Sequence, residues 1–166
     1  MSDTTNKLTH LDEKNQPTMV DVGDKAVTRR SATARCTVVL NDAILEQLQL
    51  GDNASEEIFT KKGPVFQTAI IAGTMAAKKT HELIPFCHPL PIEKCKIHIR
   101  SNDKKEIEID CTVAVTSKTG VEMEALTGAN IAALTIYDMC KALSHDITIK
   151  ECKLMAKHGG KLDFKR

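Results

Sequence analysis

The residues whose types and spacing could support chemistry begin with the segment Lys118-Thr-Gly-Val-Glu-Met-Glu124. Thr119 and Glu122 have the spacing of a capping box, in which the two residues satisfy each other's backbone N–H groups at a helix start. Glu124 has no part in this box, although two carboxylates in the first turns of a helix also suit the helix dipole, so a structural role stays open for the pair. Carboxylates at this position repel phosphate but accept hydrogen bonds from the N–H groups of a purine-like or pterin-like ring. The segment therefore predicts the binding of a heterocycle, with a purely structural role for Glu122 left open.

A second pair, Asp138 and Lys141, lies on one face of the same predicted helix, because the residues are three positions apart. On an exposed helix such a pair is a surface ion pair of little consequence. This helix is largely apolar, which favours a functional role for the two charges. Glu124 and Asp138 are 14 residues apart, or about 21 Å along a continuous helix. If both serve one nucleotide-sized ligand, we expect the site to be shared between subunits.

Basic segments supply candidates for binding an anion. Lys61-Lys62-Gly63-Pro64 precedes a predicted helix start, where free backbone N–H groups attract anions. Lys157-His-Gly-Gly-Lys161 forms a second basic loop, and Arg30 and Arg35 lie on a predicted strand. Solvated loops without function are the alternative interpretation of each segment. The sequence contains no Walker motif, which excludes a P-loop ATPase.

Phe86, Cys87 and His88 lie in the segment 85–91, where three prolines restrict the backbone and help to aim the side chains. A neighbouring cysteine and histidine also fit a thiol nucleophile or a zinc ligand. No second pair of metal ligands occurs, so we favour substrate positioning by His88 over both alternatives.

The composition narrows the class of protein. The chain has 166 residues, which fits one domain at 17–166 after a polar and flexible segment at 1–16. It lacks a long apolar run and an apolar leader, which predicts a cytoplasmic protein without a membrane span. The net charge of +1 and the aromatic content of 3% argue against nucleic-acid binding. The six cysteines form no Cys-x-x-Cys pair and are expected to be reduced.

The hydrophobic pattern predicts the elements that must position these residues. Alternation predicts strands at 27–40, 95–100, 107–115 and 147–155. Helical spacing predicts helices at 42–48, 65–82 and 121–143, with Pro64 as the first residue of the second helix. A loop is expected at 51–55. Apart from the short first helix, the order is βαββαβ. It predicts an α+β, ferredoxin-like fold, with a four-stranded antiparallel sheet, helices on one face and a small extra helix. The last long helix is apolar around its circumference, so we expect it to lie at a subunit contact.

Four motifs together resemble the MoaC family of molybdenum cofactor biosynthesis, from about Leu8 to Phe164. They are Met19-Val-Asp-Val22, Leu83-Ile-Pro-Phe-Cys-His-Pro-Leu90, Lys118-Thr-Gly-Val-Glu-Met-Glu-Ala-Leu126 and Ala133-Leu-Thr-Ile-Tyr-Asp-Met-Cys-Lys141. The chain departs from the family in two places. The tail Gly159-Gly-Lys-Leu-Asp-Phe164 is shorter and lacks a third glycine, and Phe86 replaces a more common aliphatic residue.

The resemblance implies a lyase that converts cyclised dihydro-GTP (3',8-cyclo-7,8-dihydroguanosine triphosphate), made by a radical-SAM GTP cyclase, into cyclic pyranopterin monophosphate and pyrophosphate. It implies a homohexamer built as a trimer of dimers, and no required cofactor or protein metal site, with Mg²⁺ as an optional companion of the triphosphate. The implied catalytic residues are Asp138, Lys62 and Lys141. The implied substrate-binding residues are Phe86, Cys87, His88, Met123, Glu124, Glu122, Lys157 and Arg30.

The residue types fit this chemistry. Lysines and Arg30 can neutralise the triphosphate, and Asp138 with a lysine can move protons. Several lysines in one site are expected to lower each other's pKa.

Two other classes of function stay open on the same fold. A regulatory domain would bind the nucleotide without turnover, and an interaction subunit for the radical enzyme would bind no nucleotide.

Overall fold

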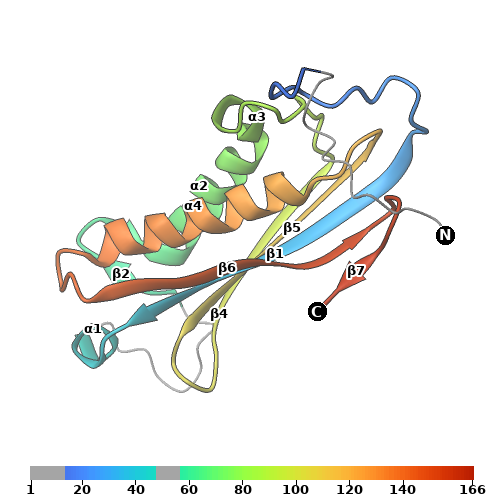
Figure 1. The fold of residues 1–166 in the computed structure, drawn as a ribbon. Coiled ribbons are helices and arrows are strands. Elements are labelled where there is room, and N and C mark those ends of the chain that lie inside the picture. Colours follow the sequence, from blue (N-terminus) through green and yellow to red (C-terminus); the bar gives the residue numbers. More distant parts are fainter. Residues whose placement is uncertain (1–13, 48–56) are drawn as a thin grey trace.

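A computed structural model describes residues 14–47 and 57–166, and its centre is a sheet with the strand order β4-β5-β1-β6-β7 (Figure 1). All neighbouring strands of this sheet are antiparallel. The strands are β1 (Thr28–Leu40), β4 (Lys94–Ser101), β5 (Ile107–Ser117), β6 (Ile147–His158) and β7 (Phe164–Lys165). A separate two-stranded hairpin consists of β2 (Phe59–Thr60) and β3 (Gly63–Pro64).

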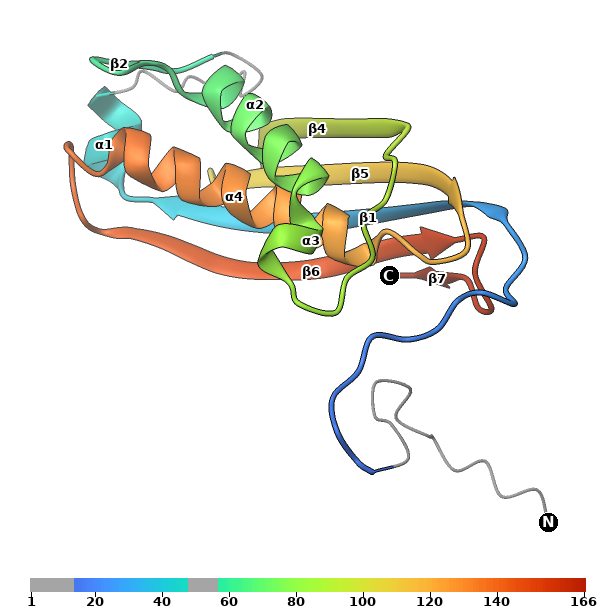
Figure 2. The same ribbon diagram turned by 90° about the horizontal axis from the view of Figure 1, so that it is seen from above.

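The described ranges contain four helices: α1 (Asp42–Gln47), α2 (Val65–Lys78), α3 (Thr80–Leu83) and α4 (Glu122–Cys140). The two long helices, α2 and α4, lie side by side on one face of the sheet (Figure 2). They approach closely at Gly73, where a Cβ atom would lie 2.6 Å from the backbone oxygen of Gly128. A larger residue would therefore push the helices apart. None of the described helices combines the length and the hydrophobicity needed to cross a membrane.

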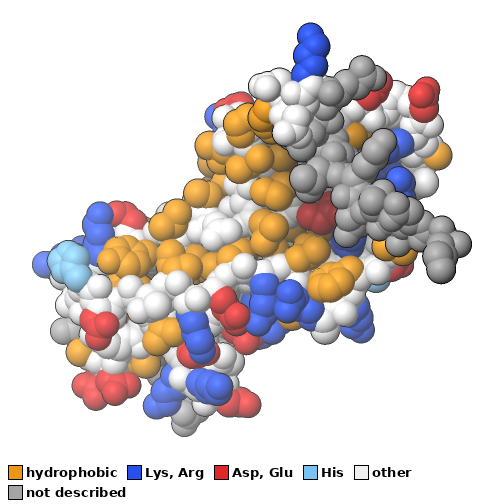
Figure 3. Space-filling model, viewed as in Figure 1, with side chains coloured by type: hydrophobic (Ala, Val, Ile, Leu, Met, Phe, Trp, Pro, Cys, Tyr) orange, Lys and Arg blue, Asp and Glu red, His pale blue; other side chains and the backbone are white. Residues whose placement is uncertain are grey.

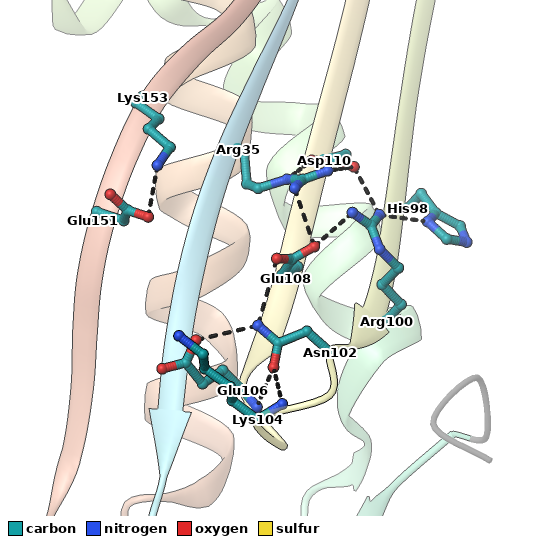
Figure 4. A network of polar contacts seen from close by, with 10 residues as sticks. All are labelled: Arg35, His98, Arg100, Asn102, Lys104, Glu106, Glu108, Asp110, Glu151 and Lys153. Atoms are coloured by element: carbon teal, nitrogen blue, oxygen red, sulfur yellow. Dashed lines mark hydrogen bonds and ion pairs between the residues drawn. The ribbon is translucent and has the colours of Figure 1, made fainter. Parts of the chain in front are cut away.

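Period-two alternation gives the sheet one apolar and one polar face. The apolar side chains of β1 and β5 point toward the helices, and Val38, Ile107 and Ile109 are fully buried there. On the helix-free face, the Asp110 carboxylate accepts hydrogen bonds from Arg35 (2.6 Å from Nε) and from Arg100 (2.7 Å), as Figure 4 shows. The core thus lies between the sheet and α2–α4, and the charged residues remain on the opposite face.

The predicted order of the main elements is confirmed, with corrections at the ends. The sheet has five strands instead of four, because the chain turns after His158 and two residues of β7 pair with β6. A two-residue strand is too short for its alternation to be visible in the sequence. Of the predicted segments, residues 1–13, the helix end at Leu48 and the loop at 51–55 lie outside the described ranges.

The helix predicted at 65–82 is divided in two at Lys79. The backbone of Lys79 has φ −112° and ψ 15°, outside the helical region, and the Thr80 hydroxyl donates a hydrogen bond to the Ala77 carbonyl oxygen at 3.0 Å. A threonine that bonds back to the preceding turn in this way competes with the helical hydrogen-bond pattern. Pro64 is the N-cap of α2 and not its first helical residue.

Candidate active site

The first turn of α4, the proline-containing turn and the end of β6 surround a cavity of about 460 Å³. The cavity is lined by seven of the residues predicted for the site: Phe86, Cys87, His88, Glu122, Met123, Glu124 and Lys157. We call this cavity and its lining residues the first cluster. Its volume lies within the range of about 300–1,000 Å³ that is typical of small-molecule sites.

Glu124 is the most unusual residue of the first cluster. Its side chain is only 4% exposed although it is ionisable, and no ion pair to it occurs among the described residues. Burial disfavours the charged carboxylate and, together with repulsion from Glu122, raises the pKa of Glu124. A buried carboxyl group that faces a cavity without a cationic partner is ready to accept hydrogen bonds from a polar ligand.

Glu122 does not form the predicted capping box. The N-cap of α4 is Val121, and the structure contains no side-chain hydrogen bond at that cap. The Glu122 carboxylate instead pairs with the Lys157 ammonium of β6 at 3.1 Å. The predicted capping box is therefore wrong, and Glu122 instead pairs with a lysine that lines the same cavity.

A smaller basic cavity of about 190 Å³ adjoins the first cluster through Gly120, Glu122 and Lys157. Arg30 and Lys161 also line it. The Arg30 guanidinium is held on β1 by a hydrogen bond from Nε to the Ser117 carbonyl oxygen at 3.0 Å. The basic loop predicted at 157–161 thus lies beside the site, where its cations can meet an anionic part of the same ligand.

Cys87 and His88 lie in the turn between α3 and β4, which has no regular secondary structure, as predicted. Burial, together with the charge of Glu124, raises the pKa of the Cys87 thiol. A raised pKa lowers the fraction of thiolate, which is the nucleophilic form. This argues against a nucleophilic cysteine. Among the residues in the described ranges, no group of three or more His, Cys, Asp and Glu side chains is arranged to hold a metal ion.

The three residues predicted to be catalytic form a second cluster at the other end of α4. The Asp138 carboxylate contacts the Lys62 ammonium at 2.7 Å and the Lys141 ammonium at 2.8 Å. Hydrogen bonds from Lys141 and Lys62 lower the pKa of Asp138 to about 2. The same contact raises the pKa of Lys141. The expectation that clustered lysines lower each other's pKa is therefore wrong for Lys141, because its hydrogen bond to the Asp138 carboxylate is the largest influence on this pKa.

Lys62 lies at the tip of the β2–β3 hairpin, and a cavity of about 440 Å³ lies between this hairpin and the end of α4. The predicted anion site at the start of α2 is not available, because the Glu57 carboxylate already accepts hydrogen bonds from the backbone N–H groups of Phe66 (2.7 Å) and Gln67 (2.8 Å). The charge at the start of this helix is compensated within the chain. Lys62 instead extends to α4.

One chain does not bring the two clusters together. Glu124 and Asp138 belong to one continuous helix, Glu122–Cys140, so their separation of 14 positions corresponds to about 21 Å. Seven predicted residues thus surround the first cavity, Arg30 lines its basic neighbour, and Lys62, Asp138 and Lys141 form the distant second cluster.

Several residues of the site were not predicted from their chemistry. Val20, Val22 and Lys25 line the first cavity. The two valines belong to the motif Met19-Val-Asp-Val22, which was noted for its resemblance alone. Lys25 follows this motif in a polar segment without periodicity, so the local sequence contains no signal for its position.

Comparisons with known proteins agree with these motifs. A family model described as the MoaC family matches residues 19–160, a range that includes every residue predicted for the site. The cyclic pyranopterin monophosphate synthase of Xanthomonas axonopodis pv. citri (strain 306) is 56% identical over 158 residues, which cover 95% of this chain and 93% of the relative. The molybdenum cofactor biosynthesis bifunctional protein of Synechocystis sp. is 56% identical over 160 residues, or 94% of this chain and 45% of the relative. Molybdenum cofactor biosynthesis protein 1 of Dictyostelium discoideum is 52% identical over 168 residues, or 94% of this chain and 27% of the relative.

Proposed function

Because the chain belongs to the MoaC family, we propose that it is a cyclic pyranopterin monophosphate synthase of molybdenum cofactor biosynthesis. It would act as a phosphorus–oxygen lyase on cyclised dihydro-GTP and release cyclic pyranopterin monophosphate and pyrophosphate. The observation that carries this proposal is the buried Glu124 carboxyl group, which has no ion pair among the described residues and lines a cavity that adjoins a basic one.

The first cluster would bind the heterocycle. Glu124 would accept hydrogen bonds from the N–H groups of the ring, because no cation in the described part of the chain pairs with its carboxyl group. Phe86 and Met123 are 41% and 37% exposed, and they offer apolar surface to a flat ligand. Cys87 and His88 would position the substrate from the rigid turn.

The adjoining basic cavity would bind the triphosphate. Arg30, Lys157 and Lys161 line it, and Glu122 is its only acidic lining residue among those described. Charge-assisted hydrogen bonds from these cations would neutralise the phosphates and stabilise the departing pyrophosphate. The family's usual third glycine is missing from the tail, but Gly160 still lies in this lining. If Mg²⁺ accompanies the triphosphate, the substrate's own oxygens would supply its main ligands.

Closure of the cyclic phosphate requires a ribose hydroxyl to attack the α-phosphorus. A new P–O bond forms, the bond between the α-phosphorus and the bridging oxygen breaks, and pyrophosphate leaves with the bond electrons. The hydroxyl proton passes to a base.

Asp138 is ionised at neutral pH because its pKa is about 2, so its role would be to hold and orient the Lys62 and Lys141 ammonium groups. These lysines would exchange protons with the substrate during the rearrangement of the purine ring.

A complete site would combine the first cluster of one subunit with the second cluster of another. Exposed apolar side chains gather over α2 and α4 (Figure 3), and they include Ile71, Met75 and Leu134 at 62%, 57% and 51% exposure. Such a patch on the helix layer fits a contact with a second copy of the chain.

We propose that the chain forms a homohexamer, built as a trimer of dimers. Each subunit would have a ferredoxin-like fold, which the strand order β4-β5-β1-β6 and the helices on one face support.

The location and the partner follow from the same proposal. All six cysteines are free thiols, which agrees with a reducing, cytoplasmic environment. A radical-SAM GTP cyclase would supply the substrate. The two longer relatives, which carry additional sequence and are named for molybdenum cofactor biosynthesis, support a functional pairing with another enzyme of the pathway.

The direct test is incubation of the purified chain with cyclised dihydro-GTP. We expect release of pyrophosphate together with a product that becomes fluorescent on oxidation. Binding of the compound without pyrophosphate release would point to the regulatory domain instead. Absence of binding would favour the interaction subunit.

A further inference from the structure

The first three backbone N–H groups of α2 all have hydrogen-bond acceptors, and two of the three donate to one side chain. Pro64, the N-cap residue, has no side chain that can cap the helix. The Val65 N–H donates to the Ile58 carbonyl oxygen at 2.8 Å, whereas the next two N–H groups donate to the Glu57 carboxylate. A helix start exposes N–H groups that need such acceptors, and a negative charge there is also favoured by the helix dipole.

Glu57 also binds the backbone of the segment that leads into the β2–β3 hairpin. Its Oε1 atom accepts a hydrogen bond from the Ile58 N–H at 2.9 Å, in addition to the one from Phe66 at 2.7 Å. The carboxylate therefore joins the two ends of the segment 58–66. The β2–β3 hairpin lies between these ends, so Glu57 closes the hairpin at its base.

The tip of this hairpin carries Lys62. Gly63 follows with φ +109°, a conformation that glycine adopts readily, and the Lys62 N–H donates to the Thr60 hydroxyl at 3.2 Å. From this tip the Lys62 ammonium reaches both the backbone oxygen (2.9 Å) and the carboxylate (2.7 Å) of Asp138. The position of the ammonium therefore depends on how the base of the hairpin is fixed to α2.

We propose that Glu57 is a positioning residue, which closes the base of the β2–β3 hairpin against the start of α2 and thereby places the Lys62 ammonium on Asp138. It acts through Lys62 and has no contact with substrate in this role. Lys141 reaches Asp138 from within the α4 end itself, so its placement does not depend on Glu57. This difference between the two lysines makes the proposal testable.

The test measures the rate at which limiting acetic anhydride acetylates Lys61, Lys62 and Lys141 in the full chain, resolved by fragment-ion mass spectrometry. An ammonium group must leave Asp138 and lose a proton before it reacts. Glu57→Ala is expected to raise the Lys62 rate severalfold and leave the Lys141 rate unchanged. Asp138→Asn should raise both rates, because both lysines lose their carboxylate. Glu46→Ala, at an exposed position of α1, is the matched control and should change none of the three.

Glu57→Gln keeps a carbonyl acceptor and should give a smaller rise at Lys62, which covers the case in which the alanine variant folds poorly. An unchanged Lys62 rate in both folded variants would overturn the proposal. A uniform rise at Lys61, Lys62 and Lys141 in both variants would also overturn it, because Glu57 would then stabilise the fold in general.

The effect on catalysis rests on the proposed function, whereas the labelling does not. A displacement of about 1 Å can cost about 100-fold in rate, so we expect Glu57→Ala to lower kcat by roughly 10- to 100-fold with little change in KM, and Glu57→Gln to lower it less. An unaltered kcat despite faster Lys62 labelling would overturn the catalytic part. A wild-type chain without any activity would refute the proposed function and leave the labelling result intact.

Discussion

Replacement of Glu124 by glutamine is predicted to increase stability and to decrease activity. The pKa of Glu124 is raised from its ordinary value of 4.5, first by burial and then by Glu122. A raised folded-state pKa means that the folded protein binds this proton more tightly than the unfolded chain does. The stabilising effect of the protonated group is fully present below the ordinary pKa and is lost as the pH rises through the folded pKa. Glutamine cannot ionise and avoids this loss.

The size of the activity change follows from the one acceptor that is lost, because glutamine keeps a carbonyl oxygen but has an NH2 donor in place of the second carboxylate oxygen. A hydrogen bond to a charged group contributes about 1.5–3 kcal/mol, and about 1.36 kcal/mol corresponds to a tenfold change in rate. The loss of one such bond to the ring should therefore lower kcat/KM by roughly 10- to 150-fold. The opposite signs of the two effects would mark Glu124 as a residue retained for function at a cost to stability.

The assays are urea unfolding at one fixed protein concentration and pyrophosphate release. We expect Glu124→Gln to be more stable than the wild type at pH 7, with a gap that narrows toward pH 4. Glu122→Gln is the control: it loses the pair with Lys157 and should show no stabilisation. A Glu124→Gln variant that is less stable at pH 7, or that keeps its full kcat/KM, would refute the reasoning.

Two further substitutions test the assigned roles. Asp138→Asn removes the carboxylate that holds Lys62 and Lys141, and it should lower kcat by at least about 100-fold with an unchanged circular dichroism spectrum; normal turnover would exclude a catalytic role. Cys87→Ser should keep kcat within about threefold of the wild type, because the raised pKa of the thiol disfavours the thiolate. A loss of more than about 100-fold would identify Cys87 as a nucleophile after all.

The main elements could be predicted because their signals are local. The alternation in β4 and β5 and the turn between them specify a hairpin within one continuous segment. The start of α1 is equally local, because the Asn41 side-chain oxygen accepts a hydrogen bond from the Ile44 N–H at 3.0 Å. Helical spacing is also a local signal, and it correctly predicted that Glu124 and Asp138 lie far apart on one continuous helix.

The missed features depend on contacts between distant segments. Glu122 fits a capping box in sequence, but the structure pairs it with Lys157, 35 positions away. Lys62 and Asp138 are 76 positions apart, and no periodicity connects them. Glu57 caps a helix that begins eight residues later, across a hairpin whose strands have two residues each. Side chains that satisfy backbone groups over such distances leave no repeated pattern in the sequence.

The proposed active site combines the first cluster of one chain with the second cluster of another. The most direct measurement mixes two inactive variants, Glu124→Ala and Asp138→Ala, under conditions that allow subunit exchange. In a mixed pair, one of the two shared sites contains no substitution, so random equal mixing should restore about one quarter of the wild-type activity. Absence of any restored activity in a mixture with demonstrated exchange would contradict the shared site.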